Sequence, residues 1–137
     1  MKSSLVRGSA PAVRLIALPL ALALSACLYT YTETKPQENA RPADYKSDIL
    51  DMVRDALEDP TNIRDASIAE PALKPVAGTT RYVVCVRYNP RDGGGRYMGI
   101  RNVAAVYFGG RLTQIISATP DQCGGVVYQP FLELQKL

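Results

Sequence analysis

The chain has 137 residues, which is enough for one domain with a modest core. Three of its 16 basic residues (Lys2, Arg7 and Arg14) precede residue 27, whereas none of its 13 acidic residues does. Residues 27–137 therefore carry 13 charges of each sign, and this balance argues against a general polyanion binder. The chain contains no histidine, which excludes Ser–His and Cys–His nucleophile pairs and histidine-based zinc sites.

The first segment is typical of an export signal. Residues 1–14 are basic without any acid, and residues 15–24 form an apolar run. That run is too short to cross a bilayer as a helix, which takes roughly 20 residues. The sequence Leu24-Ser25-Ala26-Cys27 follows directly, and in this position it resembles the lipobox of bacterial lipoproteins. The resemblance covers only the first 27 residues. It implies that residues 1–26 are removed between Ala26 and Cys27, and that the thiol of Cys27 carries lipid.

The resemblance also predicts where the chain resides. Lipoproteins carry two or three acyl chains on this cysteine, and two or more chains give stable membrane anchoring. Leu28 stands where an aspartate would retain an enterobacterial lipoprotein in the inner membrane. We therefore expect the periplasmic leaflet of the outer membrane rather than the inner membrane. The alternative is an ordinary secretory signal, with Cys27 as an unmodified thiol.

Residues 27–44 would then be the lipidated cysteine and a flexible tether, because residues 28–44 are polar, contain proline and show no apolar period. Tyr29 and Tyr31 either rest at the lipid–water interface or are ordinary linker residues.

Residues 45–137 are predicted to form a single small α+β domain. Apolar side chains recur at helical spacing over residues 45–59, and Pro60 ends that helix. The acidic side chains on the same segment are interpreted as a solvated face. Residues 60–80 contain three prolines and are read as a connector, with at most a short strand near residues 65–68.

Strand patterns follow over residues 81–88, 97–108 and 111–117. The glycine run 93–95 marks the first turn, and Gly109-Gly110 marks a two-residue hairpin. Residues 126–137 either add a fourth, edge strand or pack loosely. The expected fold is thus one N-terminal helix packed on an antiparallel meander of three or four strands. This coarse order is similar to that of some small outer-membrane assembly lipoproteins.

The lipobox resemblance leaves two cysteines for other roles. If Cys27 carries lipid, Cys85 and Cys123 remain as a pair in an oxidising compartment. We expect a structural disulfide between them, which in the chain-entropy model contributes roughly 4 kcal/mol. The alternative is a pair of free redox thiols, although redox pairs are usually closer in sequence.

Basic, aromatic and glycine residues interleave in the C-terminal half. The candidate partner face consists of Arg87, Arg91, Gly94, Arg96, Tyr97 and Arg101. An exported chain would not meet nucleic acid, so the partner would be an envelope protein, peptidoglycan or another anionic surface. The alternative is that these side chains simply fill solvent-facing strand positions. Most acidic residues precede residue 71, and basic residues outnumber acidic ones after it. The basic C-terminal half therefore either attracts the acidic N-terminal half within the domain or binds a partner.

No spacing indicates a catalytic constellation, and we expect no enzyme activity, no metal and no cofactor. The predicted function is a non-catalytic binding or structural module of the cell envelope, attached to the membrane through Cys27. The alternative is a periplasmic inhibitor that blocks a lytic hydrolase with the loop around residues 93–97.

Overall fold

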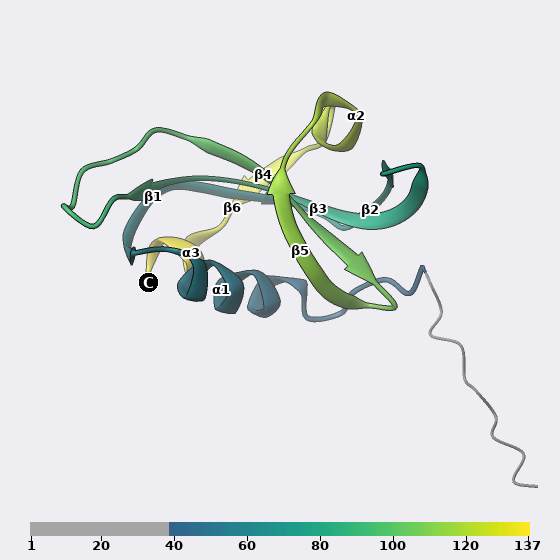
Figure 1. Cartoon of the computed structure of the whole chain (residues 1–137), viewed down its shortest axis with the longest axis horizontal. Coiled ribbons are helices and arrows are strands. Elements are labelled where there is room, and N and C mark those ends of the chain that lie inside the picture. The colour runs from purple at the N-terminus through teal and green to yellow at the C-terminus, as the bar shows by residue number, and fades with distance from the viewer. Residues whose placement is uncertain (1–38) are drawn as a thin grey trace, which may run out of the picture. The chain divides into compact units, whose positions relative to one another are not determined.

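A computed structural model describes residues 39–137, which form a mostly-β domain around one antiparallel sheet (Figure 1). The predicted signal segment, Cys27 and most of the tether lie outside the described residues. The strands are β1 (Asp59–Ala69), β2 (Ala72–Val76), β3 (Thr79–Arg91), β4 (Arg101–Phe108), β5 (Arg111–Ser117) and β6 (Tyr128–Pro130). The helices are short: α1 (Tyr45–Ala56), α2 (Pro120–Cys123) and α3 (Leu132–Gln135).

The predicted α+β fold, with a helix on three or four strands, is therefore wrong. The domain is mostly β, and its antiparallel sheet has six strands. The largest difference concerns residues 60–80, which were predicted to be a connector. β1 and β2 occupy most of that stretch. The similarity to small assembly lipoproteins depended on the order of helix and meander, and it is lost with this correction.

Two local features explain why the sequence pattern does not indicate β1 and β2. Register shifts on both sides of Arg64 interrupt the pairing of β1 with β3, and they break the alternation of buried and exposed residues. The prolines occupy positions that a sheet tolerates. Pro60 is at the start of β1, Pro71 lies between the strands, and Pro75 is in β2, which pairs only with β3.

The sheet order is β5-β4-β3-β1-β6, with β2 also paired to β3. β1 pairs with the second half of β3, where Ile68 is opposite Val86, and β2 pairs with the first half, where Ala72 is opposite Val83. β1 and β2 therefore lie end to end along the same side of β3. This arrangement makes β3 the central strand of the sheet.

Apolar side chains are buried on both faces of the sheet. On one face, α1 and α3 cover the larger core, and on the other face α2 covers the smaller one (Figure 1). Successive residues of β3 alternate between these cores: Val84 and Val86 belong to the larger, and Val83 and Cys85 to the smaller. All four are at most 2% exposed, as expected for the central strand of a sheet covered on both faces.

The C-terminal segment completes the larger core rather than packing loosely. β6 pairs with β1 over residues 67–69, and the Phe131 amide donates to the Ala66 carbonyl oxygen at 2.9 Å. The Phe131 and Leu134 side chains are fully buried. Within the described part of the chain, no helix is long and apolar enough to span a bilayer.

Candidate functional site

The described residues offer surfaces and grooves rather than a reactive cluster. Within residues 39–137, no three Asp, Glu, Cys or His side chains are grouped so that they could hold a metal ion. The sulfur atoms of Cys85 and Cys123 are joined in a disulfide, so neither residue supplies a thiol. Among the described residues, the candidate sites are therefore surfaces and grooves where a partner could bind.

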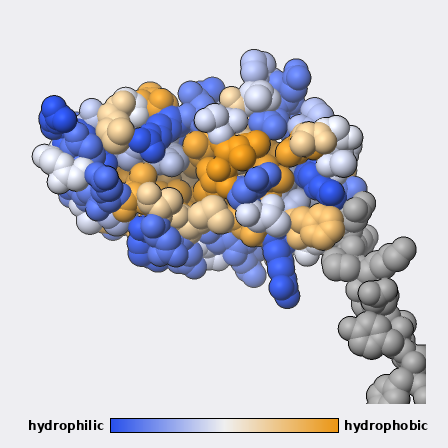
Figure 2. Space-filling view, in the orientation of Figure 1, coloured by the Kyte–Doolittle hydropathy of each residue, from blue (hydrophilic) through white to orange (hydrophobic). Residues whose placement is uncertain are grey.

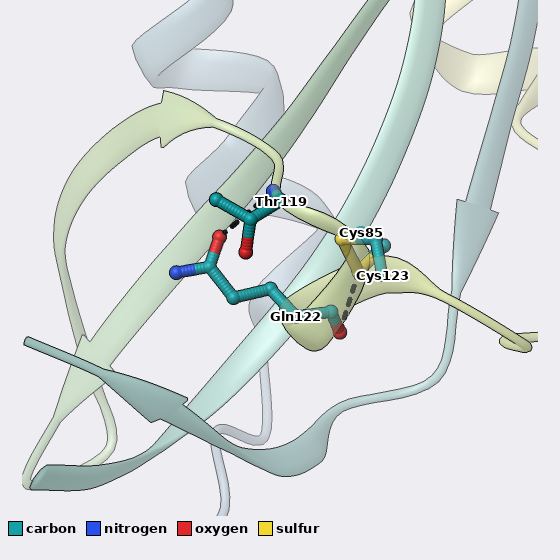
Figure 3. The surroundings of a disulfide bond; sticks show 4 residues. All are labelled: Cys85, Thr119, Gln122 and Cys123. Carbon is teal, nitrogen blue, oxygen red and sulfur yellow. Dashed lines mark hydrogen bonds between the residues drawn. A yellow bond between two sulfur atoms is a disulfide. The ribbon is translucent and has the colours of Figure 1, made fainter. Parts of the chain in front are cut away.

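The disulfide predicted between Cys85 and Cys123 is confirmed (Figure 3). It joins β3 to α2 with a Cα–Cα distance of 5.8 Å, and Cys85 is buried in the smaller core. Next to it, the amide of Thr119 donates to Oε1 of Gln122 at 3.1 Å, which closes the first turn of α2. The sulfur of Cys85 lies 3.6 Å from the carbonyl oxygen of Gln122, a contact without a proton because the sulfur is bonded to Cys123. The bridge thus fixes α2 against the sheet.

The structure does not bring the six candidate partner residues onto one face. Arg87 stacks its guanidinium on the ring of Tyr128, 4.0 Å from the centroid, beside α2. Arg101 lies on the opposite face of the sheet, where it borders a cavity together with α1. The other four residues, Arg91, Gly94, Arg96 and Tyr97, lie at the connection between β3 and β4. The fold therefore does not present these six residues on a single face.

Many of the charged and polar groups at this connection form hydrogen bonds or ion pairs with other groups of the domain. The Asp92 carboxylate accepts hydrogen bonds from the amides of Gly94 and Arg96 at 3.0 and 2.9 Å, and these bonds help to hold the pKa of Asp92 below its ordinary value. Its other oxygen pairs with the Arg96 side chain. The Tyr97 hydroxyl donates to the Asn62 carbonyl oxygen at 2.9 Å. The loop is thus tied to itself and to β1.

Arg91 is also engaged, because its guanidinium lies 2.7 Å from the Asp59 carboxylate at the start of β1. The same guanidinium donates to the Thr61 hydroxyl at 2.9 Å. Thr61 in turn donates two hydrogen bonds to Asp59, which are the main cause of a lowered Asp59 pKa. Arg91 therefore serves to join β3 to β1, and its charge is largely neutralised there.

A groove between α1 and β5 offers a site for a partner, and we call it the α1–β5 groove. One end is a cavity of about 510 Å³ with an apolar lining that includes Met52, Val53, Val103, Ile115 and Ile116. Figure 2 shows apolar side chains gathered at the surface around β5. This volume is within the range of small-ligand and side-chain pockets.

The other end of the α1–β5 groove is acidic, and Met52 borders both ends. Here a second cavity of about 520 Å³ lies between α1 and the hairpin that joins β4 to β5. Four aspartates that follow one another at helical spacing line this end, together with Arg111: Asp44, Asp48, Asp51 and Asp55. Burial, together with the Asp44 and Asp51 carboxylates, raises the pKa of Asp48.

Sequence reasoning missed the α1–β5 groove, although two signals pointed to it. Residues 111–117, the last strand of the three-stranded meander, carry two adjacent isoleucines. The aspartates recur at positions 44, 48, 51 and 55, which places them in one stripe of a helix. Only the packing of α1 beside β5 shows that these two features meet.

Comparisons with protein-family models, with curated proteins and with solved structures find no match.

Proposed function

We propose that this chain is a lipid-anchored module of the bacterial cell envelope that binds a partner without catalysis. The observation that carries the proposal is the disulfide between Cys85 and Cys123. The chain has three cysteines, so this bond leaves Cys27 as the one cysteine outside it. Cys27 is also the residue at which the lipobox resemblance places the lipid.

The disulfide supports an extracytoplasmic location independently of the N-terminal pattern. Such bonds persist in oxidising compartments such as the periplasm and are rare in the cytosol. Leu28 favours the outer membrane by the sorting rule stated above. A non-catalytic role is supported by the chain's lack of histidine and by the apolar α1–β5 groove, which is suited to contacts with another protein.

Intact mass spectrometry of membrane-fraction protein tests the anchor. The full chain and its Cys27→Ala variant would be expressed in a Gram-negative host. We expect the wild-type mass to correspond to residues 27–137 plus acyl chains, less two hydrogens for the disulfide. The variant should lack the acyl mass and leave the membrane fraction. A soluble wild-type product without acyl groups would refute the proposal.

The second candidate function is inhibition of a periplasmic lytic hydrolase. The feature that favours it is the connection between β3 and β4, which projects beyond the sheet (Figure 1). Two apolar side chains on it, Met98 and Ile100, are more than half exposed. Inhibition of a purified muramidase by the full chain, and loss of that inhibition in Met98→Ser/Ile100→Ser, would establish this function instead.

A further inference from the structure

Within residues 39–137, no strand pairs with the outer edge of β5, and this edge borders the α1–β5 groove. Among the strands of the described residues, β5 pairs only with β4. A register shift at Thr113 interrupts that pairing, but residues 114–117 pair with β4 without interruption. Their outward backbone groups therefore form a short, regular edge of the kind to which an extended peptide adds.

We propose that an extended basic segment of another protein adds to β5 as a further strand and inserts an apolar side chain into the α1–β5 groove. This inference rests on the proposed function as a binding module, and it names the chemistry of the partner. The backbone edge would supply hydrogen bonds, and the groove would select side chains.

The apolar end of the groove selects an apolar side chain. Ile115 and Val103 lie on the α1 side of the sheet. They pack against the larger core but are only partly buried. With Met52 they line the cavity of about 510 Å³ beside the free edge. A side chain from an added strand would cover this exposed apolar surface, and the removal of that surface from water favours binding.

The acidic end selects a positively charged neighbour. Asp51 is paired with Arg54 at 2.8 Å, but Asp48 and Asp55 form no ion pair with any described residue. Arg111 is the one basic residue in the lining of this end. A lysine or arginine on the added strand would offset the acidic excess, and an acidic segment would be repelled.

The same charge argues against a second copy of this chain as the occupant. Two copies joined through antiparallel β5 edges would place both α1 helices on one face of the joined sheet. Their aspartate stripes would then face each other across the junction. Like charges in such an arrangement are destabilising, whereas a basic segment is attracted.

Peptide binding to the full chain, purified from membranes in detergent, tests the inference. The probe is a fluorescent peptide of about eight residues, the length of a short strand, in which every second residue is a valine or a lysine and the residues between them are threonine. Valine and lysine side chains then lie on the same face of the added strand. The first control peptide has glutamate in place of lysine. The second keeps the lysines but carries N-methyl groups on alternate amides, which blocks strand pairing. The readouts are the dissociation constant from anisotropy and amide hydrogen exchange.

We expect the lysine peptide to bind at least about tenfold more tightly than either control, and to slow exchange of the amides in residues 114–117. Asp48→Asn/Asp55→Asn should weaken binding about fivefold, because each exposed charge pair contributes little. The matched variant Asp65→Asn/Asp121→Asn, whose residues are exposed and outside the groove, should bind like the wild type. High salt should remove the difference between the two variants.

Three outcomes would overturn the inference. Equal binding of the lysine and glutamate peptides would refute the charge selection, and binding without protection of residues 114–117 would refute strand addition. A dimer in sedimentation, with protection of the same amides in the absence of peptide, would assign the edge to a second copy. If the mass spectrum shows the anchor while the peptide does not bind, the proposed function stands and this inference fails.

Discussion

Removal of the disulfide should cost this domain a large part of its stability. Cys85 and Cys123 are 38 residues apart, and in the chain-entropy model a loop of that length restricts the unfolded chain by about 4 kcal/mol. The free energy of unfolding of a small domain is of the order of 5–15 kcal/mol. For a domain of this size, 4 kcal/mol corresponds to a fall in melting temperature of about 15–30 °C.

The assay is urea unfolding of the Cys27→Ala chain, in which Cys85 and Cys123 are the two remaining cysteines, with and without reductant. Cys85→Ala/Cys123→Ala in the same background serves as a permanently unbridged form, although it also loses two sulfur atoms, of which the one in Cys85 belongs to a buried residue. The reduced chain and this variant should both be destabilised by about 4 kcal/mol relative to the oxidised chain. A difference below about 1 kcal/mol would refute the reasoning, because it would mean that the unfolded chain is already restricted without the bridge.

Three further changes test other contacts. Phe131→Ala should destabilise the domain by about 3–5 kcal/mol in urea unfolding, because the ring is fully buried, whereas Leu132→Ala, at an exposed neighbour, should change little. Tyr107→Phe removes a hydroxyl that donates to the Tyr45 carbonyl oxygen at 3.2 Å and should cost about 1 kcal/mol; an unchanged midpoint would contradict the contribution of that bond. The lowered pKa of Asp59 means that its carboxylate stabilises the fold above its ordinary pKa of 3.8, and that this contribution is lost as the pH falls through the lowered value. Asp59→Asn should therefore melt below the wild type at pH 7 and approach it at acidic pH, and parallel melting curves across the whole range would contradict this.

Local signals in the sequence predicted β5 and its hairpin with β4 well. β5 covers residues 111–117 as expected, and Gly109 and Gly110 have the positive φ values of 57° and 76° that a tight two-residue turn requires. β3 is longer than predicted, and β4 begins at Arg101 rather than at residue 97. These elements have strong local signals, so their existence was predictable and their ends less so.

What the sequence did not reveal depends on contacts between distant residues. β1 loses its alternation at two register shifts, and Asn62 and Asp65 adopt positive φ values beside them. Such a strand is stabilised by β3 and β6 rather than by its own pattern. The residues of the candidate partner face are divided for a related reason, because residues close in sequence on β3 and β4 lie on different surfaces. The fold uses Arg87 and Arg101 on opposite faces.

The pairing of β1 with β6 joins an early segment of the domain to one of its last. Residues 67–69 of β1 pair with residues 128–130, and the core beneath them includes the side chains of Phe131 and Leu134. A growing chain that contains α1 through β5 still lacks the fully buried side chains of Phe131 and Leu134. It also lacks β6, the strand that pairs with the outer edge of β1. Completion of the larger core therefore requires the chain up to residue 134. If the chain is exported as proposed, its native core can be completed only after nearly all of the chain has crossed the membrane.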